Sequence, residues 1–266
     1  NMIKIGILGA GRVGEAFLKG LKPLHEEGKI FVAASHRRLE RREELGRKYS
    51  LKIFSSNDEL VQSSDIVIIT LKPDQFRALS ESMKRKALFK DKTVISVMAG
   101  ITLDELRDKG GIEKAFRIMP TLGVINQNGL MAMCASSHVE PQDWIDVESI
   151  LSALGDVIRL EEDKFAAFTA LGGSGPAYVA LIMESLIDSG VTIGLSRSIS
   201  KKIVDHLFLS LVGLVEIYEH PIYLREAVMS PNGTTAQGLL CLETAGVKGN
   251  IIQAVIKAYQ RAREME

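Results

Sequence analysis

The sequence has few cysteines, no surplus of charge of either sign and no long uncharged apolar run, and each shortage excludes a class of protein. Its two cysteines, Cys134 and Cys241, cannot form a disulfide framework, which favours a reducing compartment, and we expect a cytoplasmic protein. Lys and Arg number 33 and Asp and Glu also number 33, so no excess of positive charge favours a nucleic-acid partner. No two His or Cys residues have the sequence spacing that is typical of metal ligands, so we expect no metal site.

A membrane span is not expected either. The most apolar stretch, residues 177–195, is interrupted by Glu184 and Asp188. With 46% apolar and 25% charged residues, the 266-residue chain has an ordinary globular composition and the length of one large or two modest domains.

The first 160 residues alternate between short apolar runs and amphipathic stretches. The runs are typical of strands covered on both faces: Met2–Leu8, Ile30–Ala34, Ile66–Leu71, Thr93–Val97, Ala115–Met119, Leu130–Cys134 and Asp156–Leu160. The stretches of helical period are Arg12–Leu21, Arg38–Tyr49, Gln75–Phe89 and Leu103–Lys109, with another helix beginning at Pro141. This alternation predicts an α/β fold with a Rossmann-type doubly wound sheet over residues 1–160.

Residues 161–266 contain only long helical patterns. These are Ser174–Ile193, Ser198–Tyr218, Thr234–Ala245 and Lys248–Glu266. The second pattern is apolar around most of its circumference, so other protein must cover it. We expect an all-helical dimerisation domain covered by a second subunit; packing against the first domain is the alternative.

A glycine-rich loop follows the first predicted strand. The segment Gly9-Ala10-Gly11-Arg12-Val13-Gly14 is G-x-G-x-x-G between a strand and a helix, which is typical of dinucleotide binding. The alternative is a connection that serves helix packing only.

The second predicted strand ends in Ser35-His36-Arg37-Arg38, where NAD proteins usually carry an acidic residue for the ribose 2′-hydroxyl. A carboxylate there would repel a 2′-phosphate, whereas Ser35 can donate a hydrogen bond to it and Arg37 can pair with it. The sequence therefore favours NADPH over NADH, although some of these arginines belong to a solvated helix face.

Two polar, glycine-rich segments precede helices in the second half: Gly172–Pro176 and Ser230–Thr235. Open backbone amides at a helix N-terminus suit an anion such as a carboxylate. Ordinary capping, by Ser174 or Thr234, explains the same residues, and both roles can coexist.

Several motifs together give the chain a family resemblance. They are GAGRVG at 9–14, LKP at 71–73, AG at 99–100, RIMP at 117–120, GSGPAY at 173–178 and SPNGTT at 230–235. With these motifs the chain resembles the Δ1-pyrroline-5-carboxylate reductase family nearly end to end. The resemblance implies a Rossmann domain, a helical domain that interlocks two subunits, and reduction of 1-pyrroline-5-carboxylate to L-proline with NAD(P)H.

The resemblance also implies site residues, position by position. Cofactor contacts are implied at Gly9, Ala10, Gly11, Arg12, Val13, Gly14, Ser35, Arg37, Asn57, Thr70, Leu71, Lys72, Pro73, Val97, Met98 and Ala99. Substrate contacts are implied at Ser230, Gly233, Thr234, Thr235 and Glu162, with Thr235 facing the ring nitrogen as the catalytic residue. A homodimer, or a higher oligomer of dimers, is the implied assembly.

The sequence departs from the family pattern at two places. Thr121-Leu122-Gly123 replaces the usual Asn-Thr-Pro near the nicotinamide, and Asn232 replaces a glycine. Asparagine tolerates a left-handed backbone better than most residues, so the second change is mild.

Three other functions compete with this activity. A β-hydroxyacid dehydrogenase needs a lysine on the helix after the domain junction, and none occurs between Lys164 and Lys201. A reductase of a related cyclic imine or small acid, and an NADP-binding dimer without turnover, both stay open.

Overall fold

A computed structural model describes residues 2–265 of the chain. It divides into two compact units, Asn1–Gly173 with Tyr259–Glu266, and Ser174–Ala258. The domain boundary at residue 160 stays a prediction, and residues 1 and 266 of the expected domains lie outside the described part.

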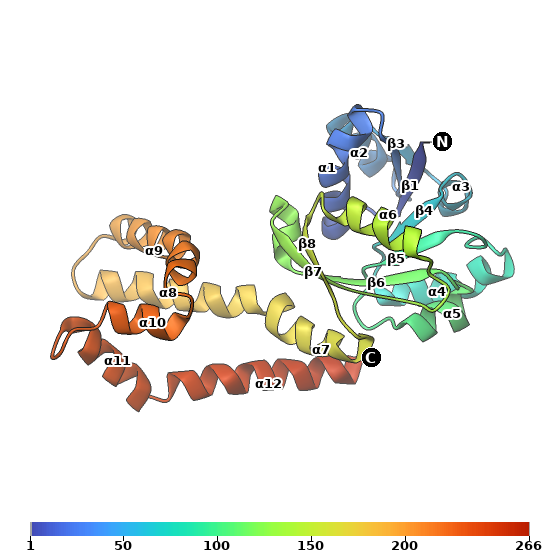
Figure 1. Cartoon of the computed structure of the whole chain (residues 1–266). Helices are drawn as coiled ribbons and strands as arrows, with labels where there is room; N and C mark the ends of the chain where they lie inside the picture. The colour runs from blue at the N-terminus through green and yellow to red at the C-terminus, as the bar shows by residue number, and fades with distance from the viewer. Residues whose placement is uncertain (1, 266) are drawn as a thin grey trace. The chain divides into compact units, whose positions relative to one another are not determined.

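The first unit contains an eight-stranded sheet (Figure 1). Its strands are β1 (Ile3–Leu8), β2 (Ile30–Ser35), β3 (Lys52–Phe54), β4 (Ile66–Ile69), β5 (Thr93–Ser96), β6 (Ala115–Pro120), β7 (Gly129–Ala135) and β8 (Gly155–Arg159). They lie in the order β3-β2-β1-β4-β5-β6-β7-β8, and every pair is parallel except β6 with β7. The chain reverses its direction of winding between β1 and β4, which is where doubly wound sheets bind ligands.

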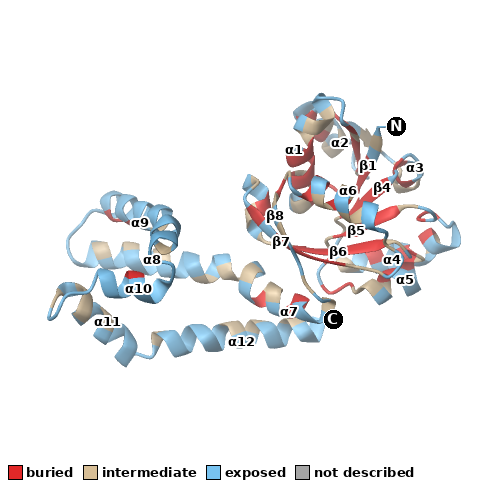
Figure 2. Ribbon diagram, in the orientation of Figure 1, coloured by how far each residue is buried: buried red, intermediate tan, exposed pale blue. Residues whose placement is uncertain are grey.

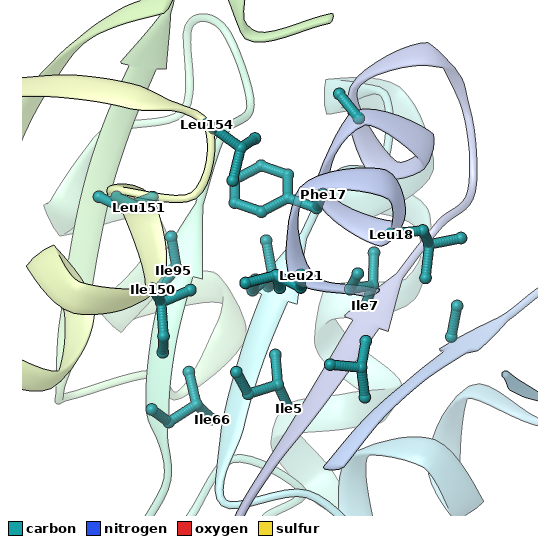
Figure 3. Packing of buried hydrophobic residues seen from close by; sticks show 14 of the residues in the cluster. Ile5, Ile7, Phe17, Leu18, Leu21, Ile66, Ile95, Ile150, Leu151 and Leu154 are labelled. Carbon is teal, nitrogen blue, oxygen red and sulfur yellow. The ribbon is translucent and has the colours of Figure 1, made fainter. Parts of the chain in front are cut away.

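Helices cover both faces of this sheet. They are α1 (Arg12–Glu26), α2 (Leu39–Tyr49), α3 (Asn57–Gln62), α4 (Pro73–Arg85), α5 (Leu103–Gly110) and α6 (Pro141–Leu151). The apolar residues of α1, α2 and α6 form one core with Ile5 and Ile7, whereas those of α3, α4 and α5 form a second core with Leu8. Figure 3 shows part of the first core, including Ile5, Ile7, Phe17, Leu21, Ile150 and Leu154. The predicted doubly wound sheet is confirmed.

The strand β3 and the helix α3 have no counterpart among the predicted strands and helices. β3 is three residues long and none of its residues is buried. β3 forms by pairing its backbone with β2, from Ala33 with Lys52 to Ser35 with Phe54. Its place at the end of the sheet explains the weak apolar pattern, since an edge strand has only one neighbour.

The unit Ser174–Ala258 is built from helices. They are α8 (Gly175–Thr192), α9 (Arg197–Ile217), α10 (Pro221–Ala227), α11 (Thr234–Thr244) and the greater part of α12 (Val247–Met265). Among its described residues only Val204 and Leu224 are buried hydrophobic side chains, and Figure 2 accordingly draws these helices mostly as exposed. On α9 alone, Leu209, Val212 and Ile217 are 79%, 69% and 74% exposed. A helical layer this apolar and this open needs a further surface to cover it.

The membrane expectation stays a prediction. By length and composition, the helical run Glu162–Thr192 is able to cross a membrane, and two bent helix pairs would also qualify if each were one span. The charges at Glu184 and Asp188 interrupt the run without lowering its mean hydropathy enough to exclude it. The same exposed apolar surface suits a subunit interface, so composition alone does not choose between these environments.

Candidate functional site

The three glycines of the first loop take up three different roles. Gly9 has φ of +100°, a left-handed conformation that favours glycine. A Cβ on Gly11 would meet no atom within 4 Å, which leaves open space for a phosphate to approach the backbone. A Cβ on Gly14 would overlap the carbonyl oxygen of Gly9 and lie 2.8 Å from Oγ1 of Thr70, so α1 packs directly on the loop. Helix α1 begins without a side-chain cap, and its first amides remain open to an anion.

A cavity of about 770 Å³ opens at this loop. It lies at the carboxyl ends of β1, β2 and β4, where doubly wound sheets bind nucleotides. Ten predicted cofactor residues line it: Gly9, Ala10, Gly11, Arg12, Ser35, Arg37, Asn57, Thr70, Leu71 and Lys72. Six others do not, namely Val13, Gly14, Pro73, Val97, Met98 and Ala99, so their cofactor contacts stay predictions. Seven lining residues had not been predicted: Glu15, His36, Arg38, Arg41, Gln75, Ala78 and Leu79.

The residues at the end of β2 are suited to binding a negatively charged group. Ser35 is buried and its Oγ donates to Oδ1 of Asn57 at 2.8 Å, which ties β2 to the start of α3. Partial burial lowers the pKa of His36, and the charges of Arg38, Arg41 and Arg37 lower it further. The local potential is therefore positive where the 2′-phosphate of NADP would lie, and the residues present fit that group.

One carboxylate in the cavity wall holds α2 against α1. Glu15 accepts from Arg41 at 2.7 Å, Lys48 at 2.6 Å and the hydroxyl of Tyr49 at 2.8 Å. Partial burial alone would raise the pKa of Glu15, but the hydrogen bonds from Lys48, Tyr49 and Arg41 outweigh it and lower the pKa to about 2. The only sequence signal for Glu15 was its position next to Gly14, because its partners come from a helix 26 to 34 residues later.

This network makes stability depend on pH. The lowered pKa of Glu15 stabilises the fold at pH values above its ordinary 4.5, and the contribution disappears as the pH falls towards 2. We expect Glu15→Gln to lower the free energy of unfolding at pH 7 by about 1–2 kcal/mol, after allowance for solvent screening. Thermal unfolding of both proteins between pH 7 and pH 2 should show the difference shrink below pH 4.5. Glu40→Gln, an exposed site on α2, is the matched control, and an equal effect there would contradict the assignment.

The loop after β5 contains three of the expected cofactor contacts, Val97, Met98 and Ala99. Met98 is buried, Ala99 is exposed, and Gly100 has φ of +70°. A Cβ on Gly100 would lie 2.7 Å from the carbonyl oxygen of Met265, so the end of α12 backs this loop. Thr121, in the segment that departs from the family pattern, bonds to β7 instead, where its Oγ1 accepts from the amide of Leu130 at 2.9 Å.

Glu162, expected at the substrate, contacts protein groups. Its Oε1 accepts from Nη1 of Arg117 at 2.9 Å and from the amide of Leu103 at 2.8 Å. A substrate contact at Glu162 stays a prediction.

The SPNGTT loop in the second unit leads into α11. Asn232 has φ of +58°, a left-handed conformation. This agrees with its place in the sequence, where the family usually has a glycine. Gly233 is the N-cap of α11, and the amide of Gly233 donates to the carbonyl of Ser230 at 3.0 Å. The amides of Thr234 and Thr235 therefore lie in the first turn, where a helix offers open donors to an anion.

The other glycine-rich segment differs from its prediction. It was expected to interrupt the chain before a helix, with either open amides or a capping Ser174. Instead Thr169–Gly173 forms a π-helical turn that continues into α8, and Ser174 makes no side-chain cap. The glycines therefore belong to the helical run Glu162–Thr192 and do not form a loop before α8. A single π turn of this kind is often found at functional sites.

Comparison with known proteins agrees with this geometry. Residues 162–265 match the family model for pyrroline-5-carboxylate reductase dimerisation, and residues 4–100 match that for NADP oxidoreductase, coenzyme F420-dependent. The pyrroline-5-carboxylate reductases of Synechocystis and Arabidopsis thaliana are 34% and 32% identical, over 99% and 98% of this chain and 98% and 95% of theirs. The Plasmodium falciparum enzyme, solved with NADP bound, superposes with a TM-score of 0.86 at 29% identity, over 100% of this chain and 99% of that one. By full-length similarity in both sequence and fold, this chain belongs to the pyrroline-5-carboxylate reductase family.

Proposed function

We propose that this protein reduces the C=N bond of 1-pyrroline-5-carboxylate to L-proline with NADPH, the last step of proline synthesis. The observation that carries the proposal is the loop Ser230–Thr235 at the N-terminus of α11. This loop is among the motifs that carry the family resemblance, whereas a cavity beside a glycine loop is a general feature of dinucleotide-binding folds.

The first unit would hold the cofactor. The open face of Gly11 and the first turn of α1 suit the pyrophosphate, and Ser35 with Arg37 suits the 2′-phosphate. When bound, NADPH supplies the hydride that is transferred to the imine carbon. The protein's own task is then to orient both molecules and to stabilise their charges.

The second unit would hold the substrate. The amides of Thr234 and Thr235 in the first turn of α11 are suited to the ring carboxylate. The hydroxyl of Thr235 would share a hydrogen bond with the ring nitrogen, as the family resemblance implies. An imine nitrogen is basic enough to take its proton from solvent, so this site needs no strong general acid, and the loop contains no His or Lys.

Thr235→Ala tests the role of the hydroxyl. We expect kcat/KM for 1-pyrroline-5-carboxylate to fall about 10- to 100-fold, because one transition-state hydrogen bond is removed while the helix amides remain. The affinity for NADPH should be unchanged, as measured by the quenching or enhancement of its fluorescence. Thr244→Ala, at the far end of α11, is the control. If Thr235→Ala keeps the wild-type kcat/KM, the hydroxyl of Thr235 has no part in the mechanism.

The activity itself is tested by following NADPH oxidation at 340 nm. The purified chain is assayed with 1-pyrroline-5-carboxylate and with the homologous six-membered imine, each with NADPH and with NADH. We expect the highest kcat/KM for the five-membered imine with NADPH. Faster turnover of the six-membered ring would indicate a related imine reductase, and NADPH binding without oxidation would indicate a dimer that does not turn over.

We also propose that the chain acts as a homodimer or a higher oligomer of dimers. The match of residues 162–265 to a dimerisation model supports this, as do the exposed apolar side chains of α9. A cytoplasmic location and the absence of nucleic-acid and membrane partners stay predictions.

A further inference from the structure

A charged pair lies where the helical part of the chain begins. Glu162 opens a short 3₁₀ turn, η2 (Glu162–Lys164), and its Oε1 accepts from Nη1 of Arg117 at 2.9 Å. The same oxygen accepts from the amide of Leu103 at 2.8 Å. One carboxylate oxygen therefore joins three segments that are 14 to 59 residues apart in the sequence.

The pair is well shielded from water on the arginine side. The side chain of Arg117 is 2% exposed and that of Glu162 is 30% exposed. The guanidinium carbon of Arg117 lies 4.8 Å from the ring centre of Phe165, which is fully buried. Burying such a pair costs desolvation energy that its attraction barely repays, so it is weak evidence for a role in stability. A role in fixing geometry accounts better for its presence.

The two donors lie beside the loop that contains the expected cofactor contacts Val97, Met98 and Ala99. Leu103 is the first residue of α5 and directly follows residues 97–102, the loop that leaves the carboxyl end of β5. Arg117 lies on β6, beside β5, and β6 ends at Pro120. Gly100, inside the loop, is backed by the carbonyl of Met265. The loop is thus supported at its middle by α12 and at its end by Glu162.

We propose that Glu162 is a positioning residue for hydride transfer, acting through Leu103 and Arg117 instead of touching the substrate. It holds the end of the 97–102 loop against β6, so that the loop presents a fixed surface to the cofactor, which Val97, Met98 and Ala99 are expected to contact. The assignment rests on the proposed function, since it concerns the geometry of that reaction. This positioning role differs from a direct substrate contact. Loss of Glu162 would displace the hydride donor, whereas the substrate carboxylate would still be bound.

The test uses Glu162→Ala and Glu162→Gln in the full chain, with Glu161→Gln as the matched control. Glutamine keeps an oxygen that can accept from the amide of Leu103, whereas alanine does not. Glu161 is exposed and adjacent. We expect Glu162→Ala to lower kcat about 10- to 100-fold, because misplacing a reacting group by about 1 Å has an effect of this size. The KM for the imine should change less than twofold. Glu162→Gln should recover most of kcat.

Hydrogen–deuterium exchange gives a second readout that does not need turnover. In Glu162→Ala the amides of residues 97–103 should exchange faster than in the wild type, and in Glu162→Gln they should stay close to it. The proposal is overturned if KM for the imine rises while kcat and exchange stay at wild-type values, which is the result for a substrate contact. It is equally overturned if only the melting temperature falls. If the wild type oxidises no NADPH with 1-pyrroline-5-carboxylate, the proposed function fails, and the exchange result still decides whether Glu162 holds the loop.

Discussion

Leu209→Asp is expected to dissociate the protein into monomers and to abolish its activity. Leu209 is 79% exposed on α9, a helix on which most other apolar side chains are also exposed and only Val204 is buried. If a second subunit covers this helix, a carboxylate there would be buried without a partner, at a cost of several kcal/mol. The dimer dissociation constant should therefore rise at least about 100-fold.

Sizing chromatography with light scattering measures this change, together with the NADPH-oxidation assay. Ile145→Asp is the matched control, because Ile145 is 60% exposed on α6 of the other unit and should tolerate the charge. A Leu209→Asp protein that remains a fully active dimer would show that this side of α9 does not lie in the interface.

Alanine at Gly14 and alanine at Gly11 are expected to act differently. A Cβ at Gly14 overlaps the carbonyl of Gly9, so Gly14→Ala should push α1 away from the loop and lower both the melting temperature and the NADPH affinity. A Cβ at Gly11 meets no protein atom, so Gly11→Ala should fold as well as the wild type. It should nevertheless lose NADPH affinity about 100-fold, because the methyl group occupies the space that the pyrophosphate needs.

Fluorescence titration with NADPH and thermal unfolding separate the two effects. Each variant serves as the other's control, since the substitution is the same and the sites are three residues apart. Wild-type NADPH affinity in Gly11→Ala would mean that the dinucleotide does not bind along this loop.

Much of the first unit could be predicted because its signals are local. The strands β1, β2, β4, β5 and β6 are nearly continuous apolar runs, broken by Lys4 in β1 and Arg117 in β6, and the apolar pattern predicts their positions within a few residues. The run Ile66–Leu71 ends earlier than predicted, at Ile69, and the next residue, Thr70, donates through its Oγ1 to the carbonyl of Gly9. That bond depends on a neighbouring strand, and no pattern within 66–71 reveals it.

Site residues divide in the same way. The glycine loop and Ser35 carry their own signature in sequence, and the structure places them in one cavity. Glu15 and Arg41 carry none, because an isolated acid and an isolated base on separate helices look like ordinary surface charges. Only the packing of α2 on α1 brings them to 2.7 Å.

By itself, the sequence determined the class of fold, the glycine loop, the basic end of β2 and the apolar excess of the later helices. These depend on residues that are neighbours along the chain, so a motif or a period of two or 3.6 residues records them. Tertiary structure alone decided the antiparallel β7, the edge strand β3, the π turn at Thr169–Gly173 and the meeting of Glu162 with Arg117 and Leu103. Such contacts join segments far apart in sequence, and their free energy depends on how backbones pair and side chains exclude water, which no local pattern encodes.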